Sequence, residues 1–279
     1  MRFSPRSIGS STEKPGAARG RLAAAVLLVL LAASLAAAPS ALPIASRESL
    51  PKDRLFPVPF LPGERLVYTI AWLKIEGGEM TLSAARAASP DGVPIHHLLL
   101  TAVSNDYVSK FYPVNTRYET WVDARDFQPL RFEKRAREGR YSSDEVEEFD
   151  LGRRIAFWRT DRTPLPERVQ DIISSFYFMR SQPLISGSDI PLDMFSRGKI
   201  YRLVVHVQEK ETVETEAGTF EAVRVQPAML GGDGEDQNRG KLFLWFSNDE
   251  RRLPVMARTF LPIGSVSARL KRVEPGGGG

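Results

Sequence analysis

The three histidines are the side chains in this chain best suited to catalysis or metal binding, but their spacing favours neither role. His96 and His97 are adjacent in a predicted strand, so they point to opposite faces and cannot share one metal ion without a bulge. His206 is isolated, and the H-E-x-x-H and G-x-S-x-G patterns of zinc proteases and serine hydrolases are absent. We therefore predict no catalytic residue, no metal and no cofactor. A hydrolase with dispersed catalytic residues stays an alternative, because the members of a triad can lie far apart in sequence.

The chain has no cysteine. This excludes a disulfide framework, a cysteine metal site, a cysteine nucleophile and a lipidated N-terminal cysteine. A second candidate metal site is the loop "GGDGEDQNRG", residues 231–240, which gathers carboxylates among glycines. Its spacing does not fit an EF-hand, since Leu244 stands where the closing glutamate belongs. We predict a solvated connection, with calcium in an irregular loop as the alternative.

Basic residues are dense between Arg131 and Arg140, and acidic residues follow directly. A three-residue loop at Glu138-Gly139-Arg140 predicts a hairpin in which Phe132 faces Val146, Lys134 faces Asp144 and Arg131 faces Glu147. Opposite charges across such a hairpin favour a solvated surface with cross-strand ion pairs. The alternative is a patch that binds anionic lipid or another polyanion.

The segment "DIISSFYFMR", residues 171–180, is predicted to be a helix that begins at Asp171 and stops before Pro183. At about 100° per residue its apolar arc includes Ile173, Phe176 and Tyr177, and Arg180 lies near the centre of that arc. A buried guanidinium needs a partner. One interpretation gives Arg180 the helix carbonyls or an internal acid such as Glu119 or Asp150. The other is an internal pocket for an amphiphile with an anionic head, and its predicted lining residues are Arg180, Tyr177, Tyr68, Trp72, Tyr118 and Trp121.

The elements that would position these side chains are mainly strands. In "RLVYTIAW" the residues Leu66, Tyr68, Ile70 and Trp72 share one face, and nine further segments show a similar pattern between turn signals. The predicted fold class is mainly β: a large curved antiparallel sheet or partial barrel of ten or more strands. One or two short helices would pack on or inside it.

The N-terminus predicts export. Basic residues precede an apolar run over residues 22–38 that ends in alanines, which is the order of a secretory signal peptide. Ala36-Ala37-Ala38 fits the small-x-small rule for cleavage after Ala38, but Pro39 would follow the cut, so cleavage after Ala36 competes with it. An uncleaved membrane anchor is the alternative. Beyond it we predict a Pro-rich arm or linker over 39–62, a single β-rich domain over 63–273 and a disordered tail over 274–279.

The charge of the exported part is balanced. Residues 1–38 contain five Arg or Lys and one Glu, so the rest of the chain holds 33 basic and 33 acidic residues. Because the exported part has no surplus of basic charge, its composition does not favour nucleic acid as a partner. The predicted location is the periplasm or the outer envelope of a bacterium, near a membrane but not integral to it unless the signal stays uncleaved.

Several segments together are similar to one family. The segments "PFLPGERLVYTIAWLKIEGGEMTL", "RYETWVD", "QDIISSFYFMRSQPL", "ETEAGTFEAVRVQP" and "LFLWFSNDERRLPVMA" resemble the bacterial exported proteins grouped as domain of unknown function 3108. The resemblance runs from about Pro59 to Leu270. It implies an envelope location and a mostly β domain, and it assigns no catalytic residue. The architecture is also similar to that of periplasmic lipoprotein carriers, whose curved sheet holds acyl chains.

Three function classes follow. The leading hypothesis is a noncatalytic envelope protein that binds a lipophilic or amphiphilic ligand in the concavity of its sheet. The alternatives are an assembly or scaffold protein that acts through contacts with envelope proteins, and the hydrolase with dispersed catalytic residues.

Overall fold

The computed structural model describes residues 56–89, 91–229, 241–261 and 264–276. Within them it has two short helices, α2 (Asp106–Ser109) and α3 (Ile172–Ser181). The strands are β1 (Glu64–Trp72), β2 (Ile75–Ala88), β3 (Pro94–Ser104), β4 (Val114–Asp123), β5 (Pro129–Glu138), β6 (Tyr141–Asp150), β7 (Ile155–Trp158), β8 (Asp161–Pro164), β9 (Asp189–Ser196), β10 (Lys199–Thr215), β11 (Gly218–Met229), β12 (Lys241–Ser247), β13 (Pro254–Leu261) and β14 (Gly264–Glu274). The predicted signal peptide, the loop at 231–240 and residues 277–279 of the predicted tail lie outside the described residues.

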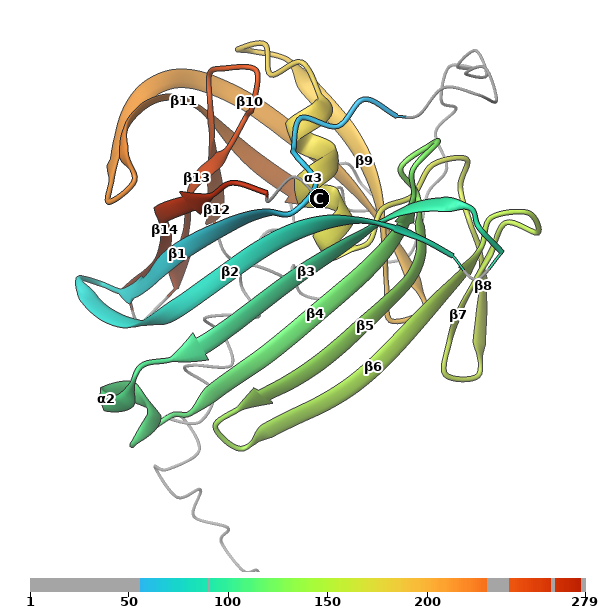
Figure 1. Ribbon diagram of the computed structural model, residues 1–279, viewed down its shortest axis with the longest axis horizontal. Coiled ribbons are helices and arrows are strands. Elements are labelled where there is room, and N and C mark those ends of the chain that lie inside the picture. Colours follow the sequence, from blue (N-terminus) through green and yellow to red (C-terminus); the bar gives the residue numbers. More distant parts are fainter. Residues whose placement is uncertain (1–55, 90, 230–240, 262–263, 277–279) are drawn as a thin grey trace, which may run out of the picture.

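All fourteen described strands belong to one antiparallel sheet. Its order is β8-β7-β6-β5-β4-β3-β2-β1-β14-β13-β12-β11-β10-β9, so β8 and β9 are the edges and the sheet is not closed. The sheet curls until its two arms enclose α3 (Figure 1). This confirms the predicted fold class.

The inner face of the sheet is the face that packs against α3. On β1 to β3 it carries Leu66, Leu82 and Leu100, which are cross-strand neighbours. Ile173 and Tyr177 of α3 belong to the same buried cluster as these leucines. A second cluster joins Met179 of α3 to apolar residues on the other arm, from β10, β11 and β12. The helix therefore supplies apolar surface to both arms, as its predicted amphipathic pattern requires.

The capping of α3 follows the predicted chemistry. The carboxylate of Asp171 accepts hydrogen bonds from the backbone N–H groups of Ile173 (2.7 Å) and Ser174 (3.0 Å). The Ser174 hydroxyl in turn accepts one from the Asp171 N–H, which completes a capping box. Asp171 is thus the N-cap, and the helix proper starts one residue later than predicted.

The Pro-rich arm ends inside the domain. The backbone N–H of Phe56 donates to the Ala124 carbonyl (2.9 Å), and the Phe56 ring stacks on that of Phe127. Phe60 is buried and meets the ring of Tyr177 edge-on at 5.2 Å. The aromatic side chains of Phe56 and Phe60 thus attach this end of the arm to the core, whereas a surface tether would stay solvated.

The hairpin between β5 and β6 differs from the prediction by one residue. Its loop has two residues, Gly139 and Arg140, because Glu138 pairs with Tyr141. Lys134 therefore pairs with Glu145, where the predicted register had Asp144. Gly139 has φ +59°, which a tight two-residue hairpin turn requires. A shift of one residue exchanges the two faces of β6, so the glutamates predicted to be solvated point inward.

Among the residues that the structure describes, no helix combines the length and the apolar character needed to cross a membrane.

Candidate functional site

Arg180 is almost fully buried, with 1% of its surface exposed, and its guanidinium is held by protein groups. Nη1 donates to Oε1 of Glu64 at 2.6 Å and Nη2 to Oε2 at 3.2 Å. Nη2 also donates to the carbonyls of Pro59 (3.1 Å) and Arg251 (3.1 Å). The guanidinium carbon lies 5.6 Å from the Tyr177 ring centre. The structure thus gives Arg180 an internal acid at the start of β1.

Neither acid that the sequence suggested for Arg180 is its partner. Glu119 lies on the outer face of β4, where it accepts hydrogen bonds from Arg117 and His97. Asp150 lies at the end of β6 and accepts from the backbone of Arg153. Strand alternation explains both positions, because inner residues of β4 have even numbers and those of β6 odd numbers. The same alternation was the available signal for Glu64, which is in step with Leu66 and Tyr68.

The structure brings three of the six predicted lining residues together. Tyr68 and Tyr177 are buried beside Arg180, and among the described residues neither hydroxyl has a hydrogen-bond partner. Burial raises the pKa of both phenols, and the nearby Arg180 charge opposes that rise. Unpartnered buried hydroxyls are uncommon, so these two groups are available for a further contact.

The other three lining residues lie elsewhere. Tyr118 is buried on the inner face of β4, and Trp72 is partly exposed at the end of β1. Trp121 is on the outer face, where its ring stacks on that of His97 at 4.9 Å. The prediction that Tyr118 and Trp121 line one pocket is therefore corrected: positions three apart in a strand face opposite sides.

The histidines also separate as their adjacency predicted. His96 points inward and packs against Phe60, and burial lowers its pKa. His97 points outward to Glu119, at 3.0 Å. His206 lies near the edge of the sheet with its Nδ1 2.7 Å from Asp189. Among the described residues, no serine hydroxyl is hydrogen-bonded to any of the three.

A polar cluster on the inner face is the feature that the sequence interpretation missed. It consists of Lys134, Glu138, Tyr141, Glu145, Glu147 and Arg197, and we call it the inner polar cluster. Arg197 donates to both oxygens of Glu145, at 2.8 and 2.9 Å. Lys134 Nζ lies 3.5 Å from Glu145 and 3.4 Å from the Tyr141 hydroxyl. It also lies over the rings of Tyr118 and Tyr141, at 5.7 and 5.5 Å from their centres.

The carboxyl groups of the cluster differ in charge. Burial alone would raise the pKa of Glu145, but hydrogen bonds from Arg197 and Ser143 hold it below its ordinary value. Burial raises the pKa of Glu147 to about 8, although the Arg197 N–H opposes this. Burial also raises the pKa of Glu138, whose Oε2 has no hydrogen-bond partner among the described residues. Near pH 7, Glu145 is ionised and Glu147 is mainly neutral.

Arg197 reaches the cluster from the far arm of the sheet. It stands in the two-residue turn between β9 and β10 with φ +50°, a strained value for a non-glycine residue. Its backbone N–H donates to Glu147 Oε1 at 2.7 Å. Beside it, the Thr163 hydroxyl of β8 donates to the Gly198 carbonyl at 2.7 Å. The turn therefore links the two edges of the sheet through side chains, where no backbone ladder joins them.

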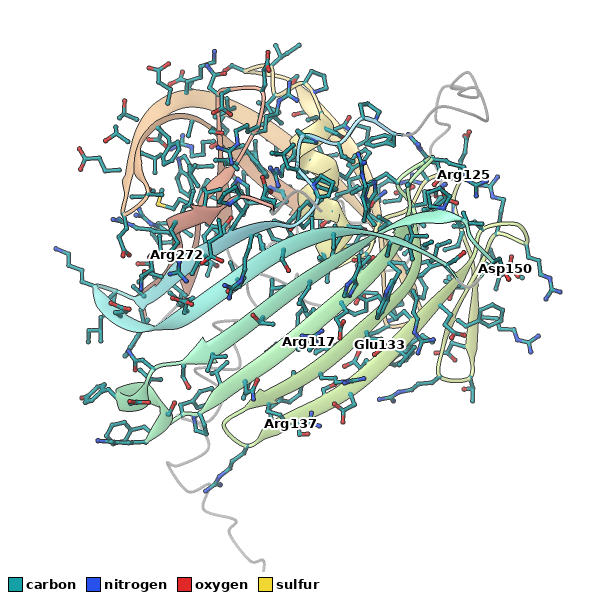
Figure 2. All side chains as sticks on the ribbon, viewed as in Figure 1. Arg117, Arg125, Glu133, Arg137, Asp150 and Arg272 are labelled. Atoms are coloured by element: carbon teal, nitrogen blue, oxygen red, sulfur yellow. The ribbon has the colours of Figure 1, made fainter. Side chains whose placement is uncertain are left out.

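The outer face of β4, β5 and β6 carries ion pairs. Figure 2 shows Arg117, Glu133 and Arg137 on the outer side of β4 and β5. Arg137 forms two hydrogen bonds of 2.8 Å with Asp144 across the hairpin. Arg131 pairs with Glu148 and Glu133. The predicted cross-strand ion pairs thus exist, with partners shifted by the shorter turn.

Comparisons with known proteins support the fold. The chain is similar to a beta-barrel-like protein of domain of unknown function DUF1849 from Brucella abortus, with a TM-score of 0.54 and 10% identity over 77% of this chain and 98% of that one. A protein with a YmcC-like fold from Bacteroides fragilis matches with a TM-score of 0.36 and 13% identity, over 79% of this chain and 100% of that one. A score that low supports no inference. The curated proteins gave no match.

A family model described as "protein of unknown function (DUF3108)" matches residues 67–271. This match confirms the resemblance found in the sequence. The chain therefore belongs to the DUF3108 family.

Proposed function

We propose that this chain is an exported, noncatalytic envelope protein that binds an amphiphile with an anionic head on the inner face of its curved sheet. The observation that carries the proposal is a single row of cross-strand neighbours. On β1, β2 and β3 the row is Leu66, Leu82 and Leu100. On β4, β5 and β6 it continues as Tyr118, Lys134 and Glu145. One continuous row thus changes from apolar to charged, which matches the tail and head of an amphiphile.

The charge of the inner polar cluster supports an anionic head. Lys134 and Arg197 are cations, whereas Glu145 is the carboxyl group whose pKa is held low. Glu147 and Glu138 have raised pKa values, so they carry less negative charge than solvated glutamates would. Lys134 Nζ makes contacts of 3.4 Å or longer and its side chain is 8% exposed. A carboxylate or phosphate would give this ammonium a closer partner.

The contacts of Arg180 change the role that we assign to it. Its guanidinium already has Glu64 and two carbonyls as acceptors. We therefore place the ligand head at Lys134 and treat Arg180 as a residue that holds α3 against β1. Tyr68, Tyr177 and Tyr118 remain proposed lining residues, since all three are buried on the inner side.

Export to the envelope remains part of the proposal. It is supported by the basic, apolar and small-residue order of residues 1–38. Location in the periplasm would be tested by fractionating cells and following the processed chain by mass.

Native mass spectrometry of the protein purified from the cell envelope, with extraction of bound lipid, tests the proposal directly. We expect adducts of amphiphile mass, and we expect purified protein stripped of lipid to bind palmitate. Lys134→Met should weaken palmitate binding by about tenfold, because it removes a charge-assisted contact. Lys210→Met is the matched control, since Lys210 is exposed on β10. A clean unliganded mass together with no palmitate binding would overturn the proposal and favour the scaffold function.

A further inference from the structure

Five exposed apolar side chains gather at one end of the curved sheet. They come from two segments, the turn between β1 and β2 and the region of α2, which lie on the same side of the molecule in Figure 1 and are joined by hydrogen bonds from Asn105 to the carbonyls of Gly77 and Glu76. We call them the apolar rim. Its members and their exposed fractions are Trp72 (39%), Leu73 (53%), Ile75 (55%), Tyr107 (65%) and Phe111 (75%). Large apolar residues this exposed are expected singly on a protein surface, but a group at one end indicates an interaction site.

The rim is held in place by hydrogen bonds to backbone carbonyl groups. The Asn105 N–H donates to the Gly77 carbonyl and its side-chain amide to the Glu76 carbonyl, both at 2.9 Å. These bonds join the start of α2 to the β1–β2 turn. On the other side, the Leu73 N–H donates to the Ser265 carbonyl at 2.7 Å. Since both segments are tied to the sheet, the apolar side chains are presented to solvent by an ordered scaffold.

The aromatic members of the rim also support one another. The rings of Tyr107 and Phe111 meet edge-on with their centres 5.7 Å apart. Tyr107 and Trp72 each combine an apolar ring with a polar group, which is the type of side chain that favours the boundary between lipid and water.

Cations border the rim. Lys74 stands within the β1–β2 turn and Lys110 directly before Phe111, and both are exposed. The β5–β6 turn, which carries Arg140, lies beside the segment that follows α2, because the Gly139 N–H donates to the Pro113 carbonyl at 2.8 Å. Among the described residues none of these three cations forms an ion pair, in contrast to Arg137 on the adjacent outer wall. Glu76 and Asp106 are the exposed acids of the same two segments and balance Lys74 and Lys110 in formal charge, so the one surplus positive charge comes from Arg140 in the β5–β6 turn.

We propose that the apolar rim docks this protein onto a bilayer that contains anionic phospholipid. The aromatic and aliphatic side chains would enter the interfacial layer, and the lysines would contact phosphate groups while their alkyl stems cross the boundary. Unpaired cations around an apolar group complement a negatively charged lipid surface. The docking surface is separate from the inner face proposed to hold a ligand, so either proposal can fail without the other.

The absence of cysteine permits a site-specific test. A single cysteine at Phe111→Cys is labelled with an environment-sensitive fluorophore in the full chain, in the form recovered from expressing cells. The matched control carries the label at Ile185→Cys. Ile185 is 65% exposed and lies in the loop between α3 and β9, at a different end of the molecule (Figure 1). Vesicles of phosphatidylethanolamine and phosphatidylglycerol are added, with vesicles of phosphatidylcholine as the uncharged comparison.

We expect a blue shift and quenching by brominated lipid at position 111 with the anionic vesicles, and little change at position 185. In vesicle sedimentation of the unlabelled chain, Leu73→Ser should lower the partition coefficient by about tenfold, as the loss of one inserted apolar side chain predicts. Lys74→Gln should lower it by about fivefold, because one lysine near a charged lipid surface contributes on that scale.

Two results would overturn the docking proposal. One is equal responses at positions 111 and 185, which would mean that any membrane contact is made by another part of the chain. The other is a change in the fluorescence at position 111 with protein concentration in the absence of vesicles, since the rim would then bind a second copy of the chain. Loss of palmitate binding by Lys134→Met would not change either readout.

Discussion

Replacement of Arg180 by methionine should destabilise the protein strongly. The variant leaves the Glu64 carboxylate buried without the cation that approaches it to 2.6 Å. It also removes the donor to the carbonyls of Pro59 and Arg251. Breaking a buried ion pair by removing one partner costs about 3 to 5 kcal/mol. The guanidinium of Arg251 lies 3.9 Å from Glu64 but is half exposed, so it offsets only part of the loss.

The expected loss of about 4 kcal/mol corresponds to a fall in Tm on the order of 10 °C for a domain of this size. Urea unfolding followed by tryptophan fluorescence would measure the free energy directly. Glu64→Gln and the double variant complete a mutant cycle, which should give a coupling energy above about 1 kcal/mol. Arg137→Met is the matched control, because the Arg137–Asp144 pair is exposed and should contribute less than about 1 kcal/mol.

A loss below about 1 kcal/mol for Arg180→Met, or a cycle in which the two changes are additive, would refute the inferred role of this pair. If Arg180→Met kept its stability but lost palmitate binding, Arg180 would belong to the ligand site. The reason for placing the ligand head at Lys134 would then no longer hold.

Two further predictions concern the β5–β6 hairpin. The pKa of Glu147 is about 8 in the folded state, above its ordinary value of 4.5. Between these pH values the folded state keeps a proton that the unfolded chain loses. The stability of the protein should therefore fall as the pH rises from 4.5 to 8. Glu147→Gln should remove that dependence, and the unfolding free energy of this variant relative to wild type should grow by roughly 3 to 5 kcal/mol from pH 4.5 to 8. Gly139 and Gly92 both have positive φ, at +59° and +78°. In Gly139→Ala the added Cβ would lie 2.4 Å from the Tyr112 ring, whereas in Gly92→Ala it would meet no atom within 4 Å. Thermal unfolding should therefore show a larger loss for Gly139→Ala, by about 1 to 2 kcal/mol, and equal losses would contradict the steric argument.

The architecture could be predicted because its signal is local and repeated. Each strand shows alternation with a period of two, and each turn carries glycine, proline or asparagine, so errors in single strands do not change the class. The helix α3 was predictable for the same reason, since its cap, its apolar arc and its terminating proline lie within thirteen residues.

The inner polar cluster could not be predicted because it depends on the length of one turn. With a three-residue loop Val146 faces the core, and with the two-residue loop Glu145 and Glu147 do. Phe149 was the overlooked signal, because it is buried and lies on the same face of β6 as these two glutamates. Arg197 lies about fifty residues farther along the chain, and only the curvature of the sheet brings it there.

The strand order has a consequence for how the chain folds. Every pair of neighbouring strands is consecutive in sequence except β1 and β14, which join the two meanders β1–β8 and β9–β14. Those two strands also bring the ends of the domain together, since Arg65 pairs with Glu274. A circular permutant that begins at β9 and runs through a β14–β1 linker to β8 would turn the whole sheet into one uninterrupted meander. Its strand contacts would then all be local, which removes the one loop closure that spans the entire domain and lowers the contact order that limits folding speed.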